Sequence, residues 1–447
     1  MRETRDSSGS RRTPSSRART RIPAVAAAAV LAGTAFAAAP AQAAAPKAPQ
    51  APKAPAAAAD CSAASRIEQK LSGGTTWRMC WHYESKAGLV LDKVTYQPKG
   101  EARPIPVLTT AKLGQIHVPY DNGANEFDDL TSYGFGEGVQ DLGTAECPGG
   151  TLKKVKLPHG AAVNGLCATT RARGHAYRVA SDENPGKVWS AQGKDFLVYT
   201  VNKVGWYEYI TEWRFSDDGT ISTQVGATGN LSPMDYDASD GRGWPVGKGA
   251  KDYAVSHSHN IFWRLNFGLD GSPKSKVQQF DATTTPRSGG TPTTKTKRTD
   301  ITKELSGKSG EQRWWRVVST AGKNKDNHPR SYEIVLGHTN KYPGRPYTRN
   351  DVYFTEYDKC QQFASHNRRC SPAVGTGKSI DTFVNGQSLK HPITWVNIGF
   401  HHVARDEDQT PMPVHWQGFQ LAPRDVTAMN PLTPSDLANQ NGQPPQG

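Results

Sequence analysis

The stretch Val204-Gly-Trp-Tyr-Glu-Tyr-Ile-Thr-Glu-Trp-Arg-Phe215 alternates bulky and charged side chains. Successive side chains of an extended strand point to opposite faces. One face then carries Tyr207, Tyr209, Thr211, Trp213 and Phe215, and the other carries Glu208, Glu212 and Arg214. This period of two predicts a half-buried β-strand with Tyr207 on its buried face.

Similar runs, rich in Val, Thr, Tyr and Trp, recur along the chain and are separated by Gly, Pro, Asp and Asn clusters. Long stretches with helical periodicity are hard to find. The pattern predicts an all-β fold. Residues 60–447 show no internal break, so we expect one domain. It is larger than most single domains, but large β-sandwiches reach this size.

The first residues have the composition of an export signal. Arginines precede an Ala-rich apolar stretch at 22–39, and Ala41-Gln-Ala43 offers a small-residue cleavage site. We expect a signal peptide at 1–43, an Ala/Pro/Lys linker at 44–59 and a secreted domain at 60–447. Pro23 and Gly33 interrupt the apolar stretch, so no membrane anchor is expected after signal removal.

The export route stays open between a twin-arginine and a general signal, because Thr13 and Pro14 follow Arg11-Arg12. Six cysteines in an exported chain predict three disulfides, and fifteen pairings are possible. Pairing of near neighbours gives Cys61 with Cys80, Cys147 with Cys167, and Cys360 with Cys370.

The net charge of +13 overstates the charge of the domain. Residues 1–43 carry seven Arg against Glu3 and Asp6, a balance of +5, and two linker lysines add +2, which leaves about +6. The basic run 295–298 resembles no nucleic-acid module, so nucleic acid is not an expected partner. The polar run 283–310 is either a hairpin reaching over a partner subunit or a plain surface loop.

Two histidines one residue apart, His257 and His259, share one face of a strand and can bind one ion. A third imidazole from the His401/His402 pair would complete an all-nitrogen set, which suits copper or zinc. A histidine pair without metal and a zinc hydrolase are the alternatives. The second of these leaves the tyrosine-rich stretch unexplained.

Several motifs occur in the order typical of one family. They are Trp77-Arg-Met-Cys-Trp81, Gly88-Leu-Val-Leu91, Val118-Pro-Tyr120, Phe127-Asp128, Tyr133-Gly-Phe-Gly136, Trp206-Tyr-Glu-Tyr209, Gly226-Ala-Thr-Gly229, His257-Ser-His259, Arg264-Leu265, Gly399-Phe-His-His402 and Met412-Pro413. Over roughly residues 65 to 425 the chain resembles the copper amine oxidases. The resemblance implies a large antiparallel β-sandwich, the catalytic domain of that family.

The resemblance also implies a site. Copper(II) would be held by His257, His259 and His402, and Tyr207 would be converted by copper and oxygen into topaquinone. Tyr120 matches the tyrosine that hydrogen-bonds the quinone. The family's catalytic base matches Asp128, whose pKa burial would raise.

Asp129 is the rival base, because this segment is one residue longer than the family pattern. The family also has a disulfide between the base-bearing segment and the quinone strand, which supports Cys147 with Cys167. The implied activity is oxidation of a primary amine by molecular oxygen to an aldehyde, ammonia and hydrogen peroxide, in a homodimer.

The chain departs from the family pattern at several positions. Trp206 replaces the Asn before the quinone tyrosine, and Lys203 replaces a Thr. Asn266 and His391 stand where the family has calcium-binding aspartates, so no structural calcium is expected. From the resemblance we expect a catalytic domain without the small leading domains of the family. A noncatalytic extracellular copper-binding or interaction protein on the same fold is therefore the second hypothesis, and the amine stays open.

Overall fold

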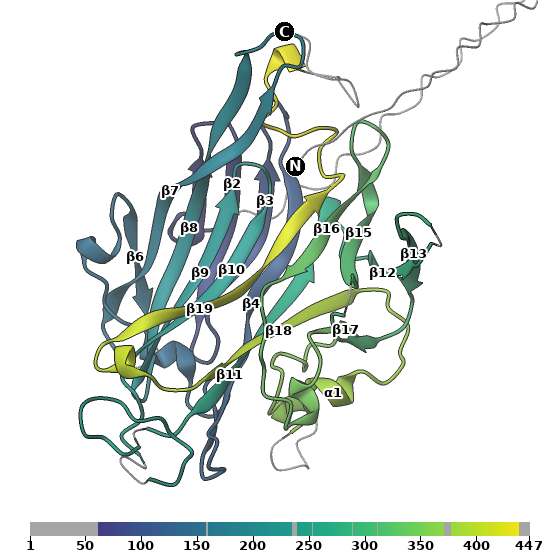
Figure 1. Ribbon diagram of the computed structural model, residues 1–447. Coiled ribbons are helices and arrows are strands. Elements are labelled where there is room, and N and C mark those ends of the chain that lie inside the picture. Colours follow the sequence, from purple (N-terminus) through teal and green to yellow (C-terminus); the bar gives the residue numbers. More distant parts are fainter. Residues whose placement is uncertain are drawn as a thin grey trace, which may run out of the picture. The chain divides into compact units, whose positions relative to one another are not determined.

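The computed structural model describes residues 61–157, 160–234, 239–252, 254–287, 289–310, 312–370 and 377–437. The predicted signal at 1–43 and linker at 44–59 lie outside these residues. The described part of the chain is built mostly from antiparallel strands in two sheets (Figure 1). The all-β prediction is confirmed.

The first sheet has the strand order β1-β2-β3-β4-β11-β18-β17-β14, and β5 pairs with β4. Its strands are β1 (Arg66–Lys70), β2 (Thr76–Glu84), β3 (Gly88–Gln97), β4 (Ile105–Pro119), β5 (Glu126–Asp128), β11 (His257–Phe267), β14 (Leu305–Gly307), β17 (Val352–Glu356) and β18 (Pro392–His402). Strand β11, buried along its whole length, lies between β4 and β18.

The second sheet has the order β13-β12-β15-β16-β19-β10-β9-β8-β7-β6. Its strands are β6 (Thr151–Lys156), β7 (Ala162–Ala180), β8 (Val188–Val204), β9 (Tyr207–Ser216), β10 (Ile221–Gly229), β12 (Ser275–Thr285), β13 (Thr293–Ile301), β15 (Trp314–Lys323), β16 (Pro329–Leu336) and β19 (Met412–Arg424). The predicted strand around Tyr207 is β9.

The main hydrophobic core lies between the two sheets. Trp77 of β2 packs against Phe215 of β9 with ring centroids 5.1 Å apart, and its indole Nε1 donates to the Ser216 carbonyl at 2.9 Å. Trp213 and Phe215 are fully buried, and Tyr207 is 3 % exposed. The alternation in β9 therefore buries the face that the sequence predicts, and the domain is a β-sandwich.

The short helices lie in the connections. They are α1 (Ile380–Phe383) and the 3₁₀ turns η1 (Ala63–Ser65), η2 (Phe135–Gly138), η3 (Thr144–Glu146), η4 (Leu269–Gly271), η5 (Pro346–Thr348), η6 (Arg368–Cys370), η7 (Asp406–Asp408) and η8 (Ser435–Leu437). Among the described residues, none of these is long and apolar enough to cross a membrane.

A second, smaller cluster covers the outer face of the first sheet. Phe262 of β11 and Trp395 of β18 pack there against Tyr347 of η5 and Phe383 of α1. The first sheet is thus covered on both faces near its centre. The connection between β16 and β18, which contains η5 and α1, forms the outer cover.

Three disulfides join Cys61 to Cys80, Cys147 to Cys167, and Cys360 to Cys370. These are the pairs that near-neighbour spacing predicts. Cys147 and Cys167 are both buried, in a small cluster with Leu142.

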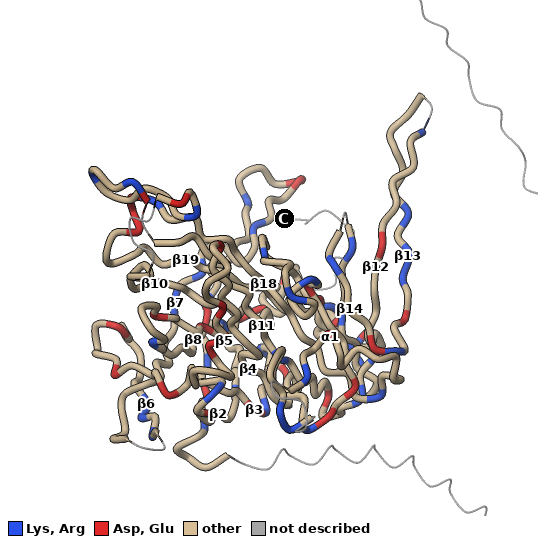
Figure 2. Tube along the Cα trace, turned by 90° about the horizontal axis from the view of Figure 1, so that it is seen from below, with Lys and Arg blue, Asp and Glu red and all other residues tan. Residues whose placement is uncertain are grey.

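The polar run 283–310 forms much of the hairpin between β12 and β13, whose strands pair from Val277 with Ile301 to Thr285 with Thr293. Figure 2 shows this hairpin extending away from the rest of the domain, with the basic residues of β13 along it. Of the two interpretations from the sequence, the hairpin is the one in the structure. Its predicted contact with a partner subunit stays a prediction.

Candidate metal and tyrosine site

Strand alternation brings the two histidines of β11 to the inner face of the first sheet. His257 and His259 contact Tyr207 of β9, and the core residues Ile261 and Trp263 follow on the same face of β11. Strand β18 pairs with β11 so that His402 lies opposite His257. Paired residues share a face, and His402 therefore joins the two histidines.

His401 points the other way, with its Nε2 2.8 Å from an Asp121 carboxylate oxygen. The potential ligand atoms of His257, His259 and His402 all lie within 4.8 Å of one another. Within the described residues, this is the one group of three such side chains that converges in this way.

The hydroxyl of Tyr207 lies where the imidazoles converge. It is 2.8 Å from His257 Nε2 and 2.8 Å from His402 Nδ1. The ring of Tyr207 stacks on Tyr209, with centroids 5.7 Å apart and planes inclined by 19°. Burial raises the pKa of Tyr207 well above its usual value, so the phenol is protonated at neutral pH.

Each imidazole has one nitrogen held by a protein group. His257 Nδ1 lies 3.1 Å from the Val255 carbonyl, and His402 Nε2 lies 2.9 Å from an Asp408 oxygen. Both nitrogens donate there, so their second nitrogens are acceptors that face the Tyr207 hydroxyl. One hydroxyl proton cannot satisfy two acceptors. A cation between these atoms would relieve that conflict.

His259 adds the clearest sign of a missing ligand. Its Nδ1 is 3.3 Å from the Tyr209 hydroxyl, and its Nε2 is buried without a hydrogen-bond partner. Burial, with a smaller effect of His402, lowers the pKa of His257 to about 3, and burial lowers that of His259 well below its usual value. Three preoriented imidazoles, two of which burial keeps neutral, fit copper or zinc.

Asp408 is a residue whose role the sequence reasoning missed. Its carboxylate holds His402 Nε2 and also accepts from the Arg405 main-chain N–H at 3.0 Å. Asp408 is 3 % exposed. In the sequence, the signal for this role is that Asp408 lies close to the Met412-Pro413 motif. The contact between Asp408 and His402 becomes visible only in the fold.

We expect Asp408→Asn to lower copper affinity by about 10- to 100-fold, because the carboxylate fixes the tautomer and orientation of His402. The measurement is a competition titration with a copper chelator. Asp406→Asn, on the same turn, is the control. Equal affinities for the Asp408 variant and the wild type would contradict this role.

Tyr120 lies beside the site but does not contact Tyr207 through its hydroxyl. Its ring stacks on His257 at 4.7 Å, and its oxygen accepts from the Trp206 indole Nε1 at 3.0 Å. Trp206 also packs against Phe127, with centroids 6.0 Å apart. Trp206 thus orients Tyr120, and Lys203 is exposed and takes no part.

The structure corrects the expectation for Asp128. Asp128 pairs in register with His117, and His117 pairs with Asn260, the neighbour of His259 on the opposite face. The carboxyl of Asp128 therefore lies on the outer face of the sheet. Its pKa is not raised as expected: burial opposes ionisation, but the imidazoles of His117 and His366 outweigh it and lower the pKa.

Asp129 occupies the inner face instead. Its carboxyl hydrogen-bonds the Tyr209 hydroxyl, and burial together with the charge of Asp128 raises its pKa to about 7. Tyr209 in turn contacts His259. Asp129 is therefore a carboxyl beside Tyr209, the ring on which Tyr207 stacks, and it can gain and lose a proton near neutral pH.

A cavity opens beside His402. Its walls include Tyr207, Phe400, Met412 and His415. His415 stacks on Phe400 with centroids 3.9 Å apart, and the sequence reasoning did not single it out. The cavity gives small molecules a way to the metal side of Tyr207.

Asn266 and His391, where no calcium site is expected, contact each other directly. His391 Nε2 lies 2.8 Å from the Asn266 amide oxygen. Nearby, Asp270 pairs with Arg330 at 2.7 Å. A neutral pair and a neutralised carboxylate offer little to a hard cation, and the absence of calcium stays a prediction.

An antiparallel sandwich with three imidazoles converging on a buried tyrosine hydroxyl is the arrangement of a metal-binding protein. A sequence profile described as "Copper amine oxidase, enzyme domain" matches residues 68–441. The chain belongs to the copper amine oxidase family.

Among curated relatives, it is 26 % identical over 411 residues to a primary amine oxidase of Arthrobacter sp. (strain P1), covering 82 % of this chain and 61 % of that protein. It is 26 % identical over 407 residues to primary amine oxidase 2 of Arabidopsis thaliana, covering 82 % and 59 %. The chain thus spans about three fifths of the length of these relatives.

Among solved structures, the copper-containing benzylamine oxidase of Hansenula polymorpha aligns with a TM-score of 0.68 at 21 % identity. The alignment covers 82 % of this chain and 62 % of that one. An Aspergillus nidulans amine oxidase aligns with a TM-score of 0.65 at 19 % identity, covering 80 % and 52 %. These structures share the fold of the domain.

Proposed function

We propose that this protein is a secreted, copper- and topaquinone-dependent primary-amine oxidase. The observation that carries the proposal is the placement of the Tyr207 hydroxyl, 2.8 Å from both His257 Nε2 and His402 Nδ1. An aromatic ring buried at converging metal-ligand atoms is the arrangement needed to modify that ring. Family membership supports the same assignment.

His257, His259 and His402 would hold copper, and Tyr207 would become the topaquinone, which supplies an electron sink for the amine. The overall reaction consumes a primary amine, one O₂ and one water, and yields an aldehyde, ammonia and hydrogen peroxide. The carbon bearing the amine is oxidised and O₂ is reduced by two electrons.

The role of the chain's own residues follows from the geometry. Asp129, on the inner face and hydrogen-bonded to Tyr209, takes the proton from the α-carbon of the amine. Tyr120 is held by Trp206 at the edge of the site. The rings of Tyr120, Phe127 and Trp206 exclude water and favour the neutral form of a bound amine.

The test is peroxide release from the copper-loaded protein. Methylamine, benzylamine and histamine are offered in air, and aldehyde is measured alongside peroxide. Equal molar yields of the two products support the proposal. A protein with copper bound and no turnover of any primary amine in a wider panel would contradict it.

A pH profile tests the base. A carboxyl with a pKa of about 7 accepts a proton only when ionised, so kcat is expected to rise with pH through about 7 and to fall tenfold per unit below it. The measurement is kcat at saturating benzylamine between about pH 5 and pH 9. A profile without an acid limb in this range would contradict Asp129 as the base.

Secretion and dimerisation belong to the same proposal. Three disulfides are expected of an exported protein. N-terminal sequencing of protein recovered from the culture medium tests cleavage after Ala43. Homodimerisation is proposed from family membership. Light scattering on the purified protein tests the homodimer.

The noncatalytic alternative rests on Trp206. Its indole N–H donates a hydrogen bond to the hydroxyl of Tyr120, the residue that by resemblance would hydrogen-bond the quinone. If this arrangement prevents maturation, the protein binds copper without oxidising amines. Trp206→Asn would then gain amine oxidation that the wild type lacks.

A further inference from the structure

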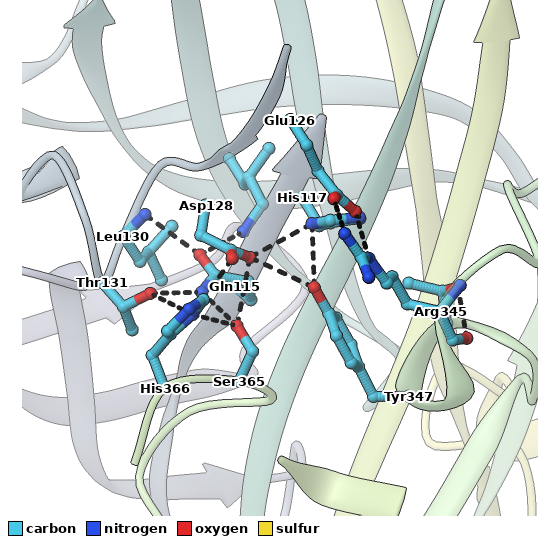
Figure 3. Close-up of polar contacts among 12 residues, drawn as sticks. Gln115, His117, Glu126, Asp128, Leu130, Thr131, Arg345, Tyr347, Ser365 and His366 are labelled. Carbon is cyan, nitrogen blue, oxygen red and sulfur yellow. Dashed lines mark hydrogen bonds and ion pairs between the residues drawn. The ribbon is translucent and has the colours of Figure 1, made fainter. Parts of the chain in front are cut away.

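A cluster of charged and polar side chains surrounds the buried residues His117 and Asp128 on the outer face of the first sheet, and Figure 3 shows its contacts. His117 of β4 is at its centre and is 0 % exposed. Its Nε2 is 2.8 Å from a Glu126 oxygen, and its Nδ1 is 3.2 Å from an Asp128 oxygen. Burial lowers the pKa of His117, but these two carboxylates outweigh it and raise the pKa.

Asp128 is held from three further sides by the segment that covers the sheet. His366 Nδ1 lies 3.0 Å from one oxygen, and the Ser365 hydroxyl donates to the other at 3.1 Å. The Tyr347 hydroxyl is 3.5 Å from the same oxygen and 2.9 Å from His117 Nδ1. Arg345 pairs with Glu126, so the positive and negative charges are matched.

The cluster is not a second metal site. Among the described residues, the inner histidines are the one group whose ligand atoms converge. Among the inner histidines, His259 Nε2 has no partner, whereas both oxygens of Asp128 have partners and each nitrogen of His117 faces a carboxylate. Buried ion pairs contribute little net stability, so the cluster calls for another explanation.

The main chain that follows Asp128 is fixed at two consecutive N–H groups. The Asp129 N–H donates to the Ile116 carbonyl at 2.9 Å, and the Leu130 N–H donates to the Gln115 side-chain oxygen at 3.0 Å. Gln115 itself donates to Ser365 at 2.8 Å. The Asp128–Asp129 peptide is thus tied to the outer cluster.

Adjacent residues of an extended segment point to opposite faces, so an anchor on Asp128 sets the direction of the Asp129 side chain. We propose that Asp128 is a positioning residue, clamped by His117 and His366 on the outer face so that Asp129 presents its carboxyl to Tyr209 on the inner face, next to the ring of Tyr207. This inference rests on the proposed function, in which Asp129 removes the α-proton of the amine.

The first test is Asp128→Asn in the copper-loaded enzyme. Misplacement of a base by a fraction of an ångström to 1 Å lowers the rate, so we expect kcat for benzylamine to fall about 10- to 100-fold. KM should stay within about threefold. The deuterium isotope effect on kcat with α,α-dideuterobenzylamine should rise, because proton removal becomes slower than the other steps.

Two comparisons separate positioning from a loss of structure. His366→Gln keeps an N–H donor for Asp128, so it should retain more kcat than His366→Ala. Asp92→Asn is the matched control, since Asp92 also accepts from a histidine and a hydroxyl, at 2.6 Å and 3.0 Å, on the same sheet. Its kcat should stay within about twofold of wild type.

Copper and modified Tyr207 per subunit are measured for every variant. The inference would be overturned if Asp128→Asn had the same kcat per modified Tyr207 and the same isotope effect as the wild type. If Asp128→Asn does not fold, the same criterion applies to His366→Ala.

A wild type that oxidises no amine would instead refute the proposed function. The inference is then tested in the metal-free protein by carboxyl ¹³C NMR, with the Asp129 signal identified by its loss in Asp129→Asn. The signal should move and titrate at lower pH in Asp128→Asn, because the neighbouring charge is gone. An unchanged shift and midpoint would overturn the clamp.

Discussion

His259→Ala is expected to abolish stable copper binding and, with it, any modification of Tyr207. The imidazole Nε2 of His259 is buried and unpartnered, so a cation is the partner that the site provides for it. Loss of a direct ligand should lower the copper affinity by more than the roughly 10- to 100-fold that follows from loss of a hydrogen bond to a ligand. Copper per subunit after dialysis is the measurement.

His401→Ala is the matched control, because its imidazole is in the same region but faces Asp121 on the other side of β18. It should bind copper like the wild type. Equal loss of copper in both variants would contradict the assignment of His259, His257 and His402 as the ligand set. Full copper binding by His259→Ala would contradict it as well.

Asp129→Asn is expected to lower kcat by about 10²- to 10⁴-fold, since the amide cannot accept the α-proton. Copper binding and the modification of Tyr207 should be unaffected, because Asp129 is linked to the histidines only through Tyr209. The measurement is single-turnover reduction by benzylamine followed by absorbance.

The same experiment distinguishes the two carboxyls. Asp128→Asn should reduce kcat less than Asp129→Asn, since Asp128 acts through its neighbour. Wild-type kcat in Asp129→Asn, together with complete loss in Asp128→Asn, would restore Asp128 as the base. The position of the two side chains on opposite faces of the sheet would then need another explanation.

Much of the site was predictable from strand periodicity. The period of two places Tyr207 in the core of the sandwich and puts His257 and His259 on one face. The same rule predicts that His401 and His402 point to opposite faces, and the resemblance to the family selected His402. Long strands such as β9 and β11 make this reliable, because a run of bulky residues fixes which face is buried.

The identity of the base depends on the same alternation, but here the strand is too short for the alternation to be read from the sequence. Strand β5 has three residues and is followed by turns, so no run of side chains sets its phase. A shift of one residue exchanges the two faces, and Asp128 and Asp129 exchange roles with it. The sequence holds no sign of this shift except the extra residue before Tyr133.

Contacts between distant segments were also beyond the sequence. The outer cluster joins Asp128 to His366, 238 positions later, through a covering segment that has little regular structure. The hydrogen bond from Trp206 to Tyr120 likewise depends on how β9 faces the end of β4. Periodicity sets faces within a strand, but it does not set which segments meet.

The central claim is that Tyr207 is the precursor of a quinone at a copper site. Its most direct test is the mass of the peptide that contains Tyr207, from metal-free protein exposed to copper in air. We predict a gain of two oxygens and a loss of two hydrogens on Tyr207, absent in His257→Ala. An unmodified Tyr207 in protein with copper fully bound would contradict the claim and favour the noncatalytic copper-binding protein.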